Sequence, residues 1–183
     1  MKKIFFLFFL GIYFIVFGFN VKSIVFFREQ EHHSPTIFLN IFFEGGIVVY
    51  NKPEKESCII LHNDIVNEDF IMFTIKDVND SMFNVIAFSS LTDSVITSGW
   101  IYKNNHLGIF SSAYNKEQHM QLFEHPSTNS EIVIEESSYN SDVYEVIDAD
   151  GEWLKVRIRI RDSIFEGWMP PFFQCSNPYT TCS

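Results

Sequence analysis

Apolar and polar residues alternate strictly along residues 153–160, and this alternation predicts a half-buried β-strand. The two faces of the strand would carry Leu154, Val156, Ile158 and Ile160 on one side and Trp153, Lys155, Arg157 and Arg159 on the other. Every second side chain of a strand points to the same face, so the apolar set should contact a core. Asp150-Gly151 just before the strand indicates a hairpin turn, and Gly167-Trp168 begins another strand.

The same pattern occurs earlier in the chain, which predicts an internal duplication. Three blocks recur at offsets of 73, 71 and 68 residues: 46–57 at 119–130, 73–85 at 144–156, and 98–101 at 166–169. The offset changes only between blocks, where loops are expected, because one extra residue inside a strand would turn its side chains to the other face. Each copy has several short strands separated by turn signals, which predicts a small antiparallel β-barrel or sandwich.

The first 23 residues have the layout of a secretory signal peptide. Lys2 and Lys3 precede an uncharged apolar run at 4–21, and cleavage is expected after Ser23. The run is nearly long enough to span a bilayer, so an uncleaved anchor is the alternative. With Lys2 and Lys3 held inside, both alternatives export the rest of the chain to a periplasm, a cell envelope or the extracellular space.

The charge of the exported part limits its partners. Removal of residues 1–23 leaves ten basic and 23 acidic residues and changes the formal net charge from -10 to -13. Such a charge argues against nucleic acid and anionic lipid as main partners, so a membrane role is expected only if the N-terminal segment stays uncleaved. The remaining chain, about 160 residues rich in aromatics, is sufficient for one medium domain or two small ones.

The duplication and the turn signals divide the chain into six parts. These are a signal peptide or anchor (1–23), an N-terminal linker or extension (24–44), a first, divergent repeat (45–103), a connector (104–117), a second repeat (118–172) and a C-terminal tail (173–183). Within 24–44, a polar cluster ending in Pro35 predicts a break, and the apolar run 37–43 fits either a strand or a short helix. Apolar residues in the connector indicate that it packs on one repeat.

Three cysteines are present, and two of them are close in sequence. Cys175 and Cys182 are separated by a turn-rich spacer, and export to an oxidising compartment permits a disulfide between them. Closing so short a loop stabilises a fold by about 2–3 kcal/mol on the chain-entropy estimate. Cys58 is then the odd cysteine, and its place before Ile-Ile-Leu favours a buried, small apolar role.

The second copy has an ordered set of signals: a strand with an aromatic residue before a Pro turn, a hairpin with Asp-Gly and Trp, and a Gly-Trp strand. The residues after the Pro turn are Tyr144, Val146, Asp148, Asp150, Gly151, Trp153, Val156, Gly167 and Trp168. This set resembles the bacterial SH3-like domain (SH3b type). The first copy departs from it, since Asp80 stands at the position of Gly151 and Met82 at that of Trp153. The resemblance implies two tandem barrels of the kind that envelope proteins use to bind wall polymers or peptides.

A group of cations in the second copy is the first candidate site. Lys155, Arg157 and Arg159 share the polar face of one predicted strand with Trp153. An aromatic and cationic face of this kind suits an anionic or carboxylate-bearing ligand, such as a wall polymer or a peptide C-terminus. The preferred alternative is a structural ladder of cross-strand ion pairs with Glu135, Glu136, Asp142 or Glu145.

Aromatic residues at matching positions of the two copies are the second candidate. Trp100 and Trp168 each follow a glycine, and their expected role is core packing. The alternative is an exposed aromatic groove, in which Tyr50 and Phe123 beside the Pro turns would take part. Exposure of these rings distinguishes the two interpretations.

No enzymatic or metal-binding motif emerges. Acids alternate before Gly151, but a calcium loop needs a Glu six residues after the glycine, where Arg157 stands. A thiol hydrolase pairing Cys58 with His106 or His119 is the weakest alternative, because Cys58 lies in an apolar run and not in a polar motif at a helix start. We therefore expect no metal and no cofactor.

The sequence predicts an exported, non-catalytic protein that binds a peptide, a cell-wall polymer or an envelope protein. The alternative is a structural or inhibitory envelope protein without a ligand groove.

Overall fold

The structure is a computed structural model that describes residues 33–53, 58–112, 119–136, 142–179 and 182. The described residues all belong to one compact unit. The predicted signal peptide at 1–23 lies outside the described residues. Within the described ranges, no helix is long and apolar enough to cross a membrane.

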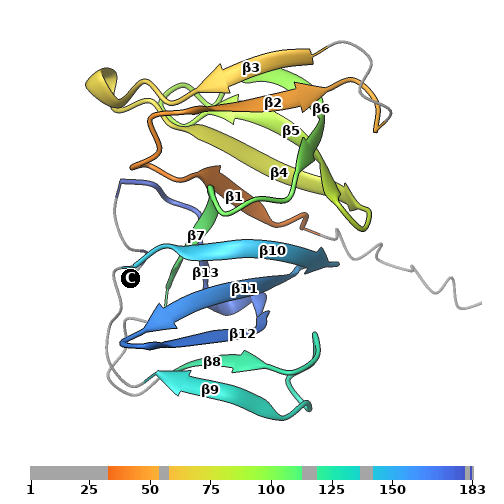
Figure 1. Ribbon diagram of the computed structural model, residues 1–183, viewed down its shortest axis with the longest axis vertical. Helices are drawn as coiled ribbons and strands as arrows, with labels where there is room; N and C mark the ends of the chain where they lie inside the picture. Colours follow the sequence, from red (N-terminus) through yellow and green to blue (C-terminus); the bar gives the residue numbers. More distant parts are fainter. Residues whose placement is uncertain (1–32, 54–57, 113–118, 137–141, 180–181, 183) are drawn as a thin grey trace, which may run out of the picture. The chain divides into compact units, whose positions relative to one another are not determined.

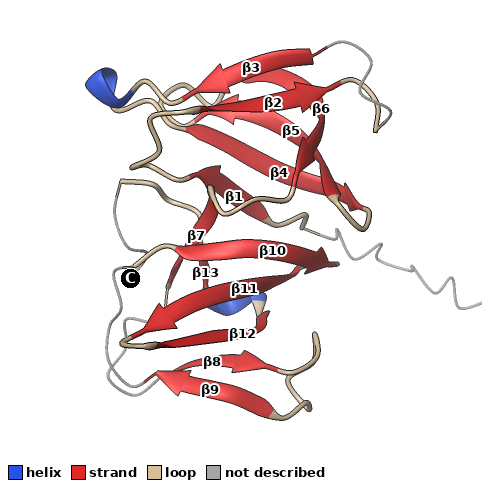
Figure 2. Cartoon of the chain, viewed as in Figure 1, coloured by secondary structure: helices blue, strands red, loops and turns tan. Residues whose placement is uncertain are grey.

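The described part of the chain is all-β, as predicted, and has no α-helix (Figure 2). Its strands are β1 (Thr36–Leu39), β2 (Gly46–Tyr50), β3 (Cys58–His62), β4 (Ile71–Val78), β5 (Met82–Ser89), β6 (Val95–Tyr102), β7 (Leu107–Ser111), β8 (Met120–Phe123), β9 (Ile132–Glu136), β10 (Tyr144–Asp150), β11 (Trp153–Ile160), β12 (Ser163–Met169) and β13 (Gln174–Cys175). Two short 3-10 turns, η1 (Ile65–Asn67) and η2 (Pro171–Phe173), complete the elements.

The strands form one antiparallel sheet in the order β3-β2-β6-β5-β4-β1-β7-β10-β11-β12-β8-β9, with β13 paired to β7 (Figure 1). The expectation of two closed barrels is corrected here. In the described residues the hydrogen-bonded path runs from β3 to β9 without closing, so that both of these strands are open edges.

The sheet has the same order of strands from either end. We call β2 to β6 the first half and β8 to β12 the second half; their orders are β3-β2-β6-β5-β4 and β9-β8-β12-β11-β10. The pairing registers also correspond. Val85 pairs with Gly99 as Val156 pairs with Gly167, and the register shift after Ile75 matches the one after Val146. These are the positions that the offsets of 71 and 68 residues bring together.

Two strands from segments outside the predicted repeats lie between the halves. β1 belongs to the segment 24–44 and pairs with β4 and β7, which settles the open choice for Thr36–Leu39 in favour of a strand. β7 belongs to the connector 104–117 and pairs with β1, β10 and β13. The connector therefore joins the two halves through backbone hydrogen bonds in the middle of the sheet.

The alternation along β11 is confirmed, since Leu154, Val156 and Ile158 are buried while Arg159 is exposed. A single hydrophobic cluster contains these residues together with core residues of the first half, β1 and β7. The predicted Cys175–Cys182 disulfide is present. Cys175 is buried in a second, smaller cluster with Phe38 and Phe110. The side chain of Cys58 lies outside the described residues.

Candidate ligand-binding face

Four of the predicted site residues of the second half form a row across three strands. Trp168 on β12 lies opposite Phe123 on β8 and opposite Lys155 on β11. Directly opposed residues of neighbouring strands point to the same face of a sheet. Trp153 is on this face too, and its ring meets that of Phe123 edge-on, with 5.8 Å between ring centroids. We call these four residues the second-half row.

The aromatic side chains of the second-half row are neither all buried, as core packing predicts, nor all exposed, as a ligand groove predicts. Phe123 is buried at 4% exposure, whereas Trp153 and Trp168 are half-buried. Phe123 therefore serves as support beneath the Trp153 ring. The two tryptophans keep part of their rings accessible, so that the row is neither a fully buried core nor a fully exposed groove.

Arg157 belongs to an ion-pair ladder, the structural alternative. Its Nη1 lies 3.0 Å from Glu145 Oε1 on β10, and its Nε donates to Glu166 Oε1 on β12 at 2.7 Å. The hydrogen bond to Glu166, with the nearby charge of Glu145, raises the pKa of Arg157 above its ordinary value. Glu145 was predicted as a partner and Glu166 was not. The charge of Arg157 is thus already neutralised within the sheet.

Lys155 and Arg159 differ from Arg157. Within the described ranges, neither has a carboxylate at ion-pair distance. Arg159 is exposed further along β11, and Lys155 is half-buried between the positions of Trp153 and Trp168. Lys155 is therefore the cation of the face that combines an uncompensated charge with aromatic neighbours.

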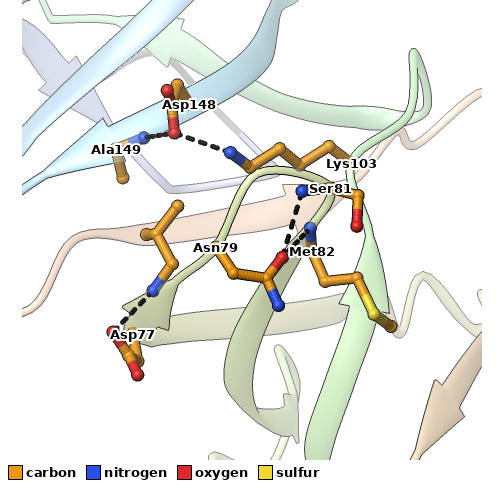
Figure 3. A network of polar contacts seen from close by, with 8 residues as sticks. Asp77, Asn79, Ser81, Met82, Lys103, Asp148 and Ala149 are labelled. Carbon is orange, nitrogen blue, oxygen red and sulfur yellow. Dashed lines mark hydrogen bonds and ion pairs between the residues drawn. The ribbon is translucent and has the colours of Figure 1, made fainter. Parts of the chain in front are cut away.

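The carboxylate opposite Lys155 takes part in a contact between the halves. Asp148 lies opposite Lys155 in the β10–β11 pairing. Its carboxylate, however, accepts a hydrogen bond from Lys103 Nζ at 2.8 Å and another from the Ala149 N–H at 2.9 Å (Figure 3). The Lys103 side chain is only 14% exposed, and its Nζ lies 5.2 Å from the centre of the Phe83 ring. No spacing in the sequence indicates this long-range pair.

The first half has an equivalent row without the cation. Trp100 on β6 lies opposite Tyr50 on β2 and opposite Asn84 on β5. Tyr50 and Trp100 are half-buried, and the Tyr50 ring meets Tyr102 edge-on at 5.7 Å. Asn84 occupies the position of Lys155. The two rows thus share a tryptophan opposite an aromatic residue. They differ in charge and in the position of Trp153, where the first half has Met82.

The first half also has a small pocket beside its row. Tyr50 and Tyr102 line a cavity of about 190 Å³ together with Phe43 and His106, whose rings stack with 3.6 Å between centroids. Trp100 does not line this pocket. Tyr50 and Trp100, although paired on neighbouring strands, therefore do not line one common groove as the sequence suggested: this pocket is bordered by Tyr50 alone of the two.

Among the described residues, no group of three or more His, Cys, Asp or Glu side chains could hold a metal ion. His119 Nδ1 contacts Glu135 Oε1 on the exposed surface of β8 and β9. This hydrogen bond and one from Gln121 hold the pKa of Glu135 below its ordinary value. No protein-family model, no curated protein and no solved structure matches the chain.

Proposed function

We propose that the chain is an exported, non-catalytic binding protein that holds an anionic ligand on the second-half row. The ligand carries a carboxylate, as in a peptide C-terminus or a wall polymer, and it reaches the protein in a periplasm, a cell envelope or the extracellular space. Lys155 binds the carboxylate, and Trp153 and Trp168 contact the adjoining apolar part. Arg159 adds positive charge along the same face.

The observation that carries this proposal is the position of Lys155. It is flanked by two partly accessible tryptophans, and Asp148 opposite it is bound to Lys103. A charged hydrogen bond contributes about 1.5–3 kcal/mol. Burial of the ligand's apolar part against the two tryptophan rings adds to it. A ligand carboxylate at this position would therefore neutralise the charge of Lys155, and the rest of the ligand would cover the accessible parts of the two tryptophans.

We further propose that each half is an SH3-like unit and that the two arose by duplication. The common strand order, the equivalent register shifts and the corresponding Gly-Trp pairs support this proposal. The units would be open forms that share a sheet through β1 and β7. A fold of this type fixes no ligand, so the function depends on the row and not on the likeness.

The experiment compares binding of the exported chain, residues 24–183, to purified peptidoglycan and to matched peptides ending in a free carboxylate or an amide. Lys155→Gln should weaken carboxylate binding by about tenfold or more, since it removes a charged hydrogen bond. Trp153→Ala should weaken it as well. Lys76→Gln, which changes an exposed lysine of the first half, is the matched control and should bind normally. Equal binding by Lys155→Gln and the control would refute the proposal.

The second candidate is a structural or inhibitory envelope protein without a ligand on this face. The Arg157 ladder and the burial of Phe123 favour it, because both commit predicted site residues to the fold. In that case, Lys155→Gln and Trp153→Ala would change thermal stability while leaving association with peptidoglycan and with envelope proteins intact.

A further inference from the structure

Three segments meet at one end of the first half. They are the β3–β4 connection (63–70), the β5–β6 turn with its flanks (88–96) and the tail (176–179). Asp69 Oδ1 accepts hydrogen bonds from Ser89 Oγ at 2.7 Å and from the Leu91 N–H at 3.2 Å. The hydroxyls of Ser90 and Tyr179 lie 2.6 Å apart. We call these three segments the loop end.

The loop end exposes apolar side chains from all three segments. Val66 is 92% exposed, Val95 67% and Leu91 62%. Ile65, Ile96 and Tyr179 are exposed to a smaller degree. Single exposed apolar residues are common on protein surfaces, but a group of them on contacting segments marks an interaction surface.

The charges of the loop end are all negative. Its segments contain Asp64, Glu68, Asp69 and Asp93 and no lysine, arginine or histidine. Hydrogen bonds from the Asn67 side chain and backbone lower the pKa of Asp64, which keeps its carboxylate ionised. Exposed apolar groups beside charges of one sign have the composition of an interface with an apolar centre and a charged rim.

The second half shows that the fold itself does not require this surface. There, two residues, Arg161 and Asp162, connect β11 to β12, and they carry opposite charges. In the first half, five residues connect β5 to β6 and include Leu91 and Asp93. Ile164 is exposed at the start of β12, as Ile96 is near the start of β6. The longer apolar turn and its acidic surroundings are therefore particular to the first half.

We propose that the loop end is a docking surface for a protein partner that presents an apolar anchor bordered by lysine or arginine residues. A basic border complements the exposed carboxylates of Asp64, Glu68 and Asp93. The anchor covers the exposed apolar side chains Val66, Leu91 and Val95. A second copy of this chain would bring like charges together, and an anionic membrane would repel the same carboxylates. The surface is separate from the second-half row and does not depend on the function of that row.

The test uses three fluorescent nine-residue peptides with the exported chain: alternating Leu and Lys, alternating Leu and Glu, and alternating Ser and Lys. The Leu/Lys peptide should bind at least tenfold more tightly than the other two. The double variant Val66→Ser/Leu91→Ser should lose about tenfold in affinity for it. The matched control is Ile132→Ser/Ile164→Ser, which removes two exposed apolar side chains of the second half and should bind normally. Glu68→Gln/Asp93→Asn should weaken binding at low salt, with a smaller effect at high salt.

Several results would overturn the proposal. Equal losses in the loop-end variant and in the second-half control would show that the peptide adheres to exposed apolar side chains in general. Equal binding of the Ser/Lys peptide would show unspecific attraction of a basic peptide to an acidic chain. Equal binding of the Leu/Glu peptide would remove the role of the carboxylates. Sedimentation that shows a dimer dependent on Val66 and Leu91 would assign the surface to a second copy. Binding to phosphatidylcholine/phosphatidylglycerol vesicles that is lost in the loop-end variant would assign it to a membrane. Circular dichroism melts show whether each variant remains folded.

Discussion

The two halves of the sheet share their strand order and pairing registers, which we call the framework, and differ in the side chains and turns that it carries. Both have five strands in the same order, a register shift at the same position and a tryptophan opposite an aromatic residue. The first half combines its row with Asn84 and with an apolar, acidic loop end; the second combines its row with Lys155 and a short turn. Features common to both halves are thus explained by folding, and those found in one half are candidates for function.

The halves are also joined more closely than two tandem units need to be. β1 and β7 pair across the middle of the sheet, one hydrophobic cluster includes both halves, and Lys103 reaches Asp148. Residues that contribute to one core normally unfold in one transition. We therefore expect substitutions at equivalent framework positions to lower the free energy of unfolding by similar amounts. Where the halves differ in side chains or contacts, the effects should differ.

The largest expected effect tests the shared core. Val85 and Val156 occupy equivalent positions, opposite Gly99 and Gly167, and both are fully buried. Replacing either valine with alanine removes buried apolar surface and leaves a small cavity, which should lower the free energy of unfolding by about 2–3 kcal/mol. Each variant should still unfold in a single transition, measured by urea titration with fluorescence and circular dichroism. Two separate transitions, one of them unchanged, would show that the halves are independent units.

The second prediction concerns the two framework glycines. A Cβ on Gly99 would lie 2.4 Å from the Tyr50 carbonyl oxygen, while a Cβ on Gly167 would first meet the Leu122 Cβ at 2.8 Å. Overpacking of this kind costs about 1–3 kcal/mol. Both contacted atoms are fixed to the backbone of a neighbouring strand, and the 2.4 Å approach at Gly99 is closer than the 2.8 Å approach at Gly167. Gly99→Ala should therefore lower the melting temperature more than Gly167→Ala. The opposite order would mean that the first half is the more adaptable one.

The sequence predicted the framework because its signals are local. Alternation predicted the faces of β11, and Asp150-Gly151 predicted its turn. The repeat offsets match positions whose strand pairings correspond in the two halves, although the offsets themselves predict no pairing. Closure was predicted wrongly, since the pairing of β1 with β7 depends on strands from the linker and the connector, which contain no repeat signal. The ladder of Arg157 followed from charge patterning. The charge pattern did not predict that Lys155 lacks an ion-pair partner. The carboxylate opposite it belongs to Asp148, which contacts Lys103, 45 positions away in the chain.

The third prediction tests the link between that contact and the site. Lys103→Met should destabilise the fold by about 1 kcal/mol, because the partly exposed Asp148 would lose its ion-pair partner. The freed carboxylate lies opposite Lys155, so it should attract that lysine and weaken carboxylate binding on the second-half row. Lys76→Met on an exposed part of β4 is the control and should change neither quantity. Unaltered ligand affinity in Lys103→Met would separate the ion pair from the site.

The smallest expected effect concerns the two open edges. Val48 pairs with Ile60 at the first edge, whereas Gln121 pairs with Glu135 at the second. The pKa of Glu135 lies below its ordinary value of 4.5, mainly because of the hydrogen bond with His119. A lowered pKa in the folded state means that this carboxylate stabilises the fold above about pH 4.5, and that the contribution is lost as the pH falls through the folded-state pKa.

Amide hydrogen exchange of β8 and β9, with rates corrected for the intrinsic effect of pH, should therefore increase between pH 6 and pH 3 relative to that of β2 and β3. Since Glu135 is exposed, the difference should be small, and Glu135→Gln should abolish it. If both edges loosened equally on acidification, and did so in Glu135→Gln as well, the cause would be the net charge of the whole chain and not this pair. The charged edge would then be no more sensitive to pH than the apolar one, and the two edges would differ only in the side chains that they expose.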